Sequence, residues 1–298
     1  MTTSRRARTA RRDPGLTGLA ALALVLYLAF LVVPVLLSLE TSFTNQNILA
    51  VGSRFVGLAN YREMLHDPQL SASIEFTLGL ATVVTIGANA IGLAFAILLN
   101  RTSLSYRVLR TLAFLPQVVS GIIVGFVWSW ILSPSGLINS ILLGTGLVGQ
   151  PVNWLGTPQL AMLSASVVVC WVLTGFTTVV YLAALQHIPR ELYDASAIDG
   201  ATSRQQFRMI TFRMVAPATT ISVVISLITV LKLYDILTAL TGGGPAHATQ
   251  SIAMYIISVG FSDGAYGYAS AIAMVLLALT AIIGLTVTTL LRRREVDL

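Results

Sequence analysis

The polar groups that could do chemistry in this chain lie inside long apolar runs. Lys232 and Asp235 are three residues apart in one such run, a spacing at which they can pair on one helical face. A structural ion pair that braces the neighbouring loop and direct contact with a bound solute are both open readings. Uncharged polar side chains occur in other runs, where each could serve either as an interhelical hydrogen bond or as a ligand contact: Asn89, Gln117, Ser226 and Thr229.

Residues suited to covalent or metal chemistry are few and scattered. His66, His187 and His247 lie between the apolar runs without the spacing of a metal site, and Cys170 is the only cysteine. The nucleotide-binding pattern G-x-x-x-x-G-K-[S/T] is absent, and leucines flank the only lysine, Lys232. The sequence therefore predicts a chain that is not itself an enzyme and that binds no metal.

The composition requires an apolar solvent around much of the chain. Of the 298 residues, 55% are hydrophobic and 10% charged, and the mean hydropathy is +0.82, whereas a soluble domain is about a quarter charged. Six apolar runs are each long enough to cross a hydrocarbon core of about 30 Å. They cover residues 16–39, 74–99, 112–132, 160–185, 218–240 and 268–291. The first is longer than the apolar part of a secretory signal and lacks a small-x-small cleavage pattern, so we expect a retained spanning helix.

The basic residues predict how these runs are oriented. Fifteen of the 18 lie before the first run, between the second and third, between the fourth and fifth, or after the sixth. These segments share one side if six helices alternate, and positive charge marks the cytoplasmic side. We therefore expect an all-α membrane protein with a cytoplasmic tail 1–15, one transmembrane domain 16–291 whose core starts at about residue 74, and a cytoplasmic tail 292–298. The positive charge then belongs to the membrane surface and does not indicate nucleic acid.

The longest expected cytoplasmic segment, residues 186–217, begins with the pattern of a short helix. Pro189 suits the first turn of a helix, where a missing N–H costs nothing. Glu191 and Asp194 would then lie near the positive end of the helix dipole. A narrow apolar stripe follows at spacings of three residues: Leu192, Ala195 and Ile198.

A tight turn and a second short helix are expected next in this segment. Asp199-Gly200 should end the first helix, because glycine adopts the left-handed conformation at little cost. Ser203 and Gln206 have the spacing of a capping box for a second helix, on which Phe207 and Ile210 face together. Such a rigid amphipathic projection would suit docking to another protein, although an ordinary connecting loop is the alternative.

Residues 194–201 resemble a family signature. Their sequence, Asp-Ala-Ser-Ala-Ile-Asp-Gly-Ala, is similar to the E-A-A-x-x-D-G-A of permease subunits of binding-protein-dependent ABC importers. The remaining part of that signature, F-x-x-I-x-L-P, is matched at Phe207 and Ile210, whereas Phe212 and Arg213 stand where Leu-Pro is usual. Asp194 replaces the glutamate and Ser196 the second alanine, so the charge and the small volume are kept.

Three further stretches resemble the carbohydrate-type permeases of this family. Residues 55–61, F-V-G-L-A-N-Y, are similar to the F-x-G-L-x-N-Y of the first outer segment. Residues 240–245, L-T-G-G-G-P, are similar to L-T-x-G-G-P, and residues 266–271, Y-G-Y-A-S-A, to the Y-G-x-A-S-A that opens the last span. The matches follow the family's order from Phe55 to Ala271.

The resemblance implies an architecture, partners and a coupling site. It implies the six-helix type I ABC importer permease architecture in a bacterial inner membrane, with a second, non-identical permease, two ABC ATPase subunits and an extracytoplasmic binding protein. ATP and Mg would be bound by the ATPases, and no cofactor by this chain. The loop 186–217 would seat in a cleft of an ATPase. The residues to which this coupling role carries over are Glu191, Asp194, Ala195, Ser196, Asp199, Gly200, Ala201, Phe207 and Ile210.

Other classes of function remain open at this stage. A secondary transporter or channel would also explain six helices, but such carriers usually have more spans and internal repeats, and the projecting loop would be unexplained. An intramembrane hydrolase would need a nucleophile with a partner such as histidine on a helix. Within the permease interpretation, the solute could be an oligosaccharide or a glycerophosphodiester. The candidates for contact with the solute are Asn89, Gln117, Ser226, Thr229, Lys232 and Asp235.

Overall fold

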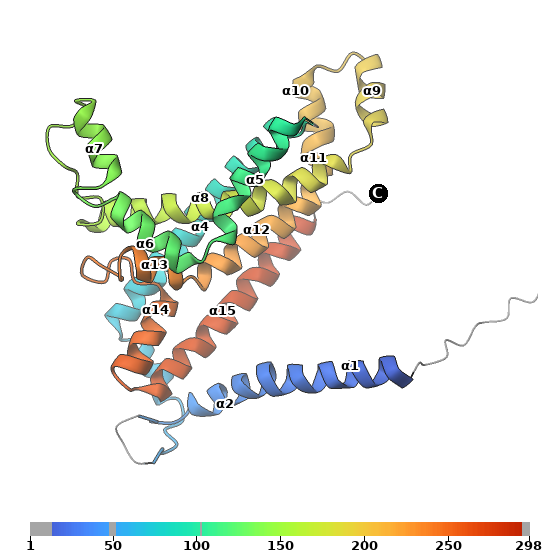
Figure 1. The fold of residues 1–298 in the computed structure, drawn as a ribbon. Helices are drawn as coiled ribbons and strands as arrows, with labels where there is room; N and C mark the ends of the chain where they lie inside the picture. The colour runs from blue at the N-terminus through green and yellow to red at the C-terminus, as the bar shows by residue number, and fades with distance from the viewer. Residues whose placement is uncertain (1–13, 48–51, 102, 294–298) are drawn as a thin grey trace, which may run out of the picture.

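The computed structural model describes residues 14–47, 52–101 and 103–293, which are almost entirely helical (Figure 1). The helices, with π-helical turns labelled η, are α1 Pro14–Tyr27, η1 Leu28–Val32, α2 Val33–Thr41, α3 Ala59–Met64, α4 Pro68–Leu98, α5 Leu104–Val118, α6 Gly121–Ile131, α7 Leu137–Gly144, α8 Pro158–Gln186, α9 Arg190–Ile198, α10 Ser203–Gln206, η2 Phe207–Thr211, α11 Phe212–Met214, α12 Ala216–Leu231, α13 Asp235–Leu240, α14 Ile252–Ile257, η3 Ser258–Ser262 and α15 Tyr266–Arg292.

The six expected apolar runs are all helical, but two of them are not single helices. Four uninterrupted stretches are long and apolar enough to span a membrane: Gly18–Thr41, Pro68–Leu98, Pro158–Gln186 and Tyr266–Arg292. The runs 112–132 and 218–240 are each interrupted by a break in the helix. In the first, α5 and α6 meet at a bend of 99°, where Val119 is extended and Ser120 is not helical. In the second, α12 ends at Leu231 and the chain resumes as α13.

The centre of the bundle is the contact between α4 and α8. Gly92 lies so close to Thr177 that a Cβ on the glycine would overlap the threonine side chain. The hydroxyl of Thr177 donates a hydrogen bond to the carbonyl of Ala88 at 2.7 Å, and the hydroxyl of Tyr181 donates to Oδ1 of Asn89 at 3.0 Å. Small residues and buried hydroxyls thus hold two spanning helices together.

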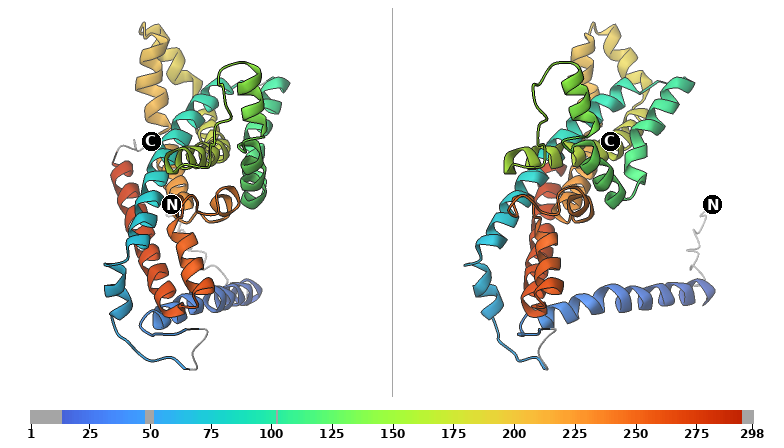
Figure 2. Two further views of the ribbon diagram at one scale, coloured as in Figure 1. Left: turned by 90° about the vertical axis from the view of Figure 1, so that its left-hand side faces the viewer. Right: turned by 60° about the vertical axis from the view of Figure 1, so that its left-hand side comes forward.

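The first spanning stretch lies apart from the others. Figures 1 and 2 show α1 and α2 running away from the bundle, which α2 meets at α15. None of the most apolar 18 residues of Gly18–Thr41 is buried. Its apolar side chains therefore face the surroundings of this chain.

At the end of the bundle opposite α9 and α10, hydrogen bonds and close packing come from two of the stretches that resemble the family, residues 55–61 and 266–271. The side-chain amide of Asn60 donates to the carbonyls of Ser42 and Thr44 at 2.7 and 2.9 Å. The backbone N–H of Gly267 donates to the carbonyl of Gln46 at 3.0 Å, and a Cβ on Gly267 would overlap the carbonyl of Thr44. The patterns at 55–61 and 266–271 therefore have a structural reason here.

Asp67 is the centre of a second hydrogen-bond network at this end, which the sequence analysis missed. One carboxylate oxygen accepts the backbone N–H groups of Gln69 and Leu70 and caps α4. The other accepts the hydroxyls of Tyr255 and Tyr268 at 2.5 and 2.6 Å. Asp67 thereby joins α4 to α14 and α15 across 188 and 201 residues of sequence, which no local pattern could indicate.

Candidate functional site

Residues 190–214 form a helical hairpin that projects from one end of the bundle (Figure 1). At its tip, Gly200 has a φ of +79°, as expected for a left-handed glycine after a helix. Its N–H donates to the carbonyl of Ala197 at 3.0 Å, and the N–H of Ala201 donates to Ser196 at 2.9 Å. This pair of bonds is a Schellman motif, which satisfies the last carbonyls of α9 and turns the chain sharply.

The second helix of the hairpin is capped one residue earlier than expected. The capping box consists of Thr202 and Gln205, whose backbone and side-chain groups bond reciprocally, so the assignment to Ser203 and Gln206 is wrong. Thr202 is the extended residue that precedes the helix, whereas Ser203 is already helical. Only the extended position can aim its hydroxyl at the free N–H groups of the first turn.

Gln206 is consequently free to link the two arms of the hairpin. Its side-chain amide donates to Oγ of Ser196 at 2.9 Å and to the carbonyl of Tyr193 at 3.2 Å. The hydroxyls of Tyr193 and Thr211 are 2.8 Å apart and hydrogen-bonded. Ser196, a predicted coupling residue, therefore faces the neighbouring helix, and Tyr193, Gln206 and Thr211 are members of this link that the sequence analysis did not identify.

The outer face of α9 is unpartnered in the described part of the chain. No residue of α9 is buried, and the stripe of Leu192, Ala195 and Ile198 is exposed, with Ile198 at 87%. The acidic residues predicted for this helix and its turn, Glu191, Asp194 and Asp199, are exposed as well. A rigid apolar ridge with acidic neighbours is the surface that another protein can bind.

The second arm connects the hairpin to the spans. Ile210 packs against the buried cluster that contains Ala96, Tyr181 and Leu185, whereas Phe207 remains 39% exposed. Ala201 is half-buried beside the turn. Ile210 therefore joins the second arm of the hairpin to α4 and α8.

The two broken spans face each other across a cavity of about 160 Å³. Gln117 at the end of α5, Thr229 on α12 and Asp235 at the start of α13 all line it. The Oε1 atom of Gln117 is buried without a hydrogen-bond partner among the described residues. Non-helical backbone at membrane depth is tolerated where it lines a cavity, so this is where a polar solute would find unpaired groups.

Close packing of α6 on α13 places the two helix breaks side by side. A Cβ on Gly121 would overlap the carboxylate of Asp235, and one on Gly125 would lie 2.5 Å from the carbonyl oxygen of Ile236. Ser251 donates its hydroxyl to the carbonyl of Leu233 at 2.7 Å, which satisfies one group freed by the second break. Close packing against α13 therefore explains why glycine occupies positions 121 and 125.

The predicted pairing of Lys232 with Asp235 is wrong. No ion pair joins them among the described residues, because α12 ends at Leu231 and the three-residue spacing does not fall on one helix. Lys232 is exposed, and Oδ1 of Asp235 accepts the N–H of Ile236 at 2.9 Å.

The six pathway candidates therefore separate into two groups. Gln117, Thr229 and Asp235 meet at the cavity. Asn89 is bonded to Tyr181, and Ser226 is fully buried with an unpartnered hydroxyl, so neither lines it. Lys232 does not line it either.

Comparison with known proteins identifies the family. Residues 88–296 match the model of the binding-protein-dependent transport system inner membrane component. The chain is 32% identical over 266 residues to a probable permease for starch degradation products from Thermoanaerobacterium thermosulfurigenes, covering 89% of this chain and 90% of that protein. It is 34% identical to a trehalose/maltose permease from Thermococcus litoralis, covering 84% of each chain.

Solved structures share the fold. A chain of a bacterial ABC transporter for import of the acidic polysaccharide alginate superposes with a TM-score of 0.82 at 24% identity, over 95% of this chain and 96% of that one. A methionine ABC transporter chain gives a TM-score of 0.58 at 19% identity, over 78% and 99%. The chain belongs to the family of binding-protein-dependent transport system inner membrane components. It is accordingly a multi-pass protein of the cytoplasmic membrane and a permease subunit of an ABC importer.

Proposed function

We propose that this permease takes up a saccharide and is driven by an ATPase that binds the outer face of α9. The observation that carries the proposal is the exposed ridge of Leu192, Ala195 and Ile198 on a hairpin whose arms are linked by Gln206. A seated ridge would transmit force because the hairpin is cross-linked and packed on the spans. The coupling roles of Glu191, Asp194, Asp199 and Gly200 belong to this proposal.

The partners follow from the same reasoning. Two ATPase subunits would bind ATP and Mg and supply the catalysis, and this chain would bind no cofactor and catalyse no reaction. A second, non-identical permease would complete the pathway. An alginate transporter related in fold was solved with its periplasmic binding protein, which supports a binding protein as a partner of this chain. The binding protein would act on the side opposite the hairpin, and both termini of this chain would lie in the cytoplasm.

A saccharide is favoured by the relatives and by the chemistry of the cavity. The two relatives above are named for starch degradation products and for trehalose and maltose, which favours an oligosaccharide over a glycerophosphodiester. Sugar hydroxyls would donate to Asp235 and to Oε1 of Gln117. A volume of about 160 Å³ is below the ~300 Å³ of ordinary ligand sites, as expected for one wall of a pathway shared with a partner.

Uptake by the reconstituted transporter tests this function. We expect ATP-driven uptake of an oligosaccharide that requires the binding protein, and no ATPase activity from this chain alone. Thr229→Val and Gln117→Ala should raise the KM for uptake roughly tenfold, the effect of losing one ligand hydrogen bond of about 1.4 kcal/mol. Thr82→Val is the matched control, because Thr82 is also exposed and bonds the carbonyl four residues earlier, but lies away from the cavity.

The outcomes separate the parts of the proposal. Uptake driven by an ion gradient without ATP would refute the ATPase partnership. An unchanged KM in both cavity variants would remove the cavity from the pathway and leave the docking role standing.

A further inference from the structure

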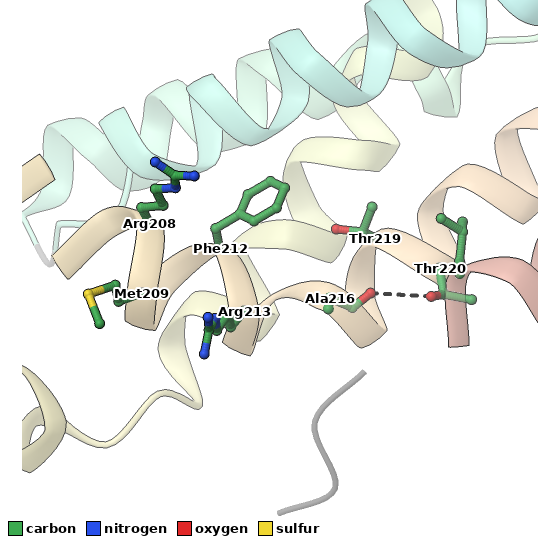
Figure 3. A pocket seen from close by; sticks show the side chains of 8 residues that line it. Arg208, Met209, Phe212, Arg213, Ala216, Thr219 and Thr220 are labelled. Atoms are coloured by element: carbon green, nitrogen blue, oxygen red, sulfur yellow. Dashed lines mark hydrogen bonds between the residues drawn. The ribbon is translucent and has the colours of Figure 1, made fainter. Parts of the chain in front are cut away.

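A second cavity, of about 330 Å³, lies where the hairpin joins α12 (Figure 3). The chain bends by 61° between Ser203–Met214 and Ala216–Leu231, and the cavity occupies this bend. Its lining comes from both sides of the bend and from the last turn of α15: Arg208, Met209, Phe212, Arg213, Ala216, Thr219, Thr220 and Leu291. None of these residues belongs to the docking ridge or to the solute cavity.

Within the part of the chain that the structure describes, the cavity carries positive charge that no acidic group balances. The side chains of Arg208 and Arg213 are exposed, and neither makes an ion pair or hydrogen bond within the described residues. No aspartate or glutamate occurs from Ser203 to Leu231. An adjoining hollow of about 640 Å³ is lined by the same two arginines and by Arg204. Three guanidinium groups therefore surround this bend without a counterion among the described residues.

Arg208 and Arg213 both line the cavity, and in Figure 3 their guanidinium groups point to opposite sides of the helix that carries them. In an α-helix with 3.6 residues per turn, side chains five positions apart point about 140° away from each other. Two forked guanidinium groups on one cavity suit the oxygens of a phosphate.

The remaining walls are apolar. Met209, Phe212 and Leu291 contribute side chains without polar groups, apart from the thioether, and Thr219 and Thr220 use their hydroxyls on the carbonyls of Val215 and Ala216. Figure 3 shows the second of these bonds beside the cavity. A small soluble anion would need only the arginines, whereas a ligand with an anionic head and an apolar body would use both kinds of wall.

The cavity lies beside the ends of two candidate spanning segments. One wall is the first turn of α12, where a candidate spanning segment begins. Another is Leu291, which directly precedes Arg292 at the end of α15. Basic pockets between spanning helices at the membrane surface bind the head groups of anionic lipids. We infer that this bend is a binding site for an anionic phospholipid, with Arg208 and Arg213 as partners of its phosphate and an acyl chain along Phe212 and Leu291.

Lipid binding to the complete transporter tests the inference. The transporter with its partner subunits is exchanged into nanodiscs or detergent, and retained phosphatidylglycerol and phosphatidylcholine are quantified by native mass spectrometry. We expect selective retention of phosphatidylglycerol, with an affinity about fivefold lower in Arg208→Gln or Arg213→Gln and about thirtyfold lower in the double variant. Arg107→Gln is the matched control, because it removes an exposed arginine from the α5 end nearest the hairpin but does not line the cavity.

Each outcome decides the inference. Equal losses in Arg107→Gln and in the cavity variants would reduce the effect to general surface charge, and unchanged retention in the double variant would mean that another subunit covers the bend. Displacement of the lipid by millimolar inorganic phosphate would identify a free-anion site instead. The single variants are decisive if the double variant does not assemble, and none of these readouts depends on the identity of the transported solute.

Discussion

At the scale of single residues, Gly200 is a position where the backbone conformation, and not the space around the residue, favours glycine. Its φ is +79°, and no atom lies within 4 Å of where its Cβ would be. Steric exclusion therefore does not require glycine at this turn. The requirement is the left-handed conformation, which costs a residue with a Cβ about 1 kcal/mol and a β-branched residue more.

Gly200→Val should insert and assemble normally but lose uptake, because a shifted turn displaces α9 from its proposed partner. Membrane level, co-purification with the ATPase and uptake should be measured on the same variant. Gly146→Val is a matched control, since Gly146 has a φ of +69° and equally open surroundings at α7, away from the hairpin. Equal loss of uptake in both variants would attribute the effect to general strain, and normal uptake in Gly200→Val would show that the hairpin is only a connector.

Asp67 predicts a pH-dependent stability at the opposite end of the bundle. Burial raises the pKa of its carboxyl, but the hydrogen bonds from Tyr255, Tyr268, Leu70 and Gln69 outweigh this, so the pKa lies below its usual value. The pKa of Tyr255 is raised by burial and by its bond to this carboxylate. A depressed carboxyl pKa contributes stability above the unfolded value of about 3.9, and this contribution is lost as the pH falls through the folded pKa.

Asp67→Asn should therefore lower the stability of the purified protein at pH 7 by about 1 kcal/mol, a low figure because the carboxylate is partly exposed. The asparagine oxygen can still cap α4, so the variant removes the charge together with the oxygen that accepts the hydroxyls of Tyr255 and Tyr268. Thermal unfolding should show the gap to the parent closing as the pH falls below about 4. Glu63→Gln, which removes an exposed carboxylate from α3, should change stability little, and a gap that stays constant with pH would contradict the assignment.

At the scale of helices, the contact of α6 with α13 determines where the two broken spans meet. Gly125→Ala would place a Cβ 2.5 Å from the carbonyl oxygen of Ile236, and backbone cannot move aside as a flexible side chain does. Overpacking of this kind costs about 1–3 kcal/mol. We expect a lower unfolding temperature together with impaired uptake, because α13 carries Asp235 into the solute cavity.

Gly79→Ala on α4 is the control for this substitution. No atom lies within 4 Å of the Cβ position at Gly79, so alanine there should be neutral or stabilise the helix by up to about 1 kcal/mol. If Gly125→Ala behaved like Gly79→Ala in unfolding and uptake, the close approach of α6 and α13 would be required neither for stability nor for uptake.

At the scale of the whole molecule, the orientation of the chain is the prediction that unites its charge pattern with its proposed partners. Fifteen of the 18 basic residues fall on the side that carries the hairpin if the six segments alternate. In a Cys170→Ala background, Ser203→Cys should resist a membrane-impermeant maleimide in spheroplasts and react after lysis. Thr145→Cys, an exposed position just after α7, should react in both. Labelling of residue 203 from outside would invert the topology and exclude a cytoplasmic ATPase on α9.

What the sequence alone determined is what short-range chemistry controls. The apolar runs follow from the cost of exposing hydrocarbon to water, and the charge asymmetry follows from the membrane potential and lipid charge. The all-helical membrane class was therefore predictable. The turn at Gly200 and the two arms of the hairpin were predictable because their bonds join residues within six positions of one another. The cap at Thr202 was displaced by one residue, since only the backbone conformation decides which hydroxyl precedes the helix.

The tertiary structure decided everything that depends on contacts between distant segments. Gln117, Thr229 and Asp235 come from three helices and meet because α12 breaks after Leu231, where neither proline nor glycine marks the sequence. The break is stabilised by Ser251, whose hydroxyl satisfies the carbonyl of Leu233. Asp67 likewise bonds to two tyrosines that are 188 and 201 residues away. Local pattern cannot reveal such pairs, because their energy exists only when packing has already brought the segments together.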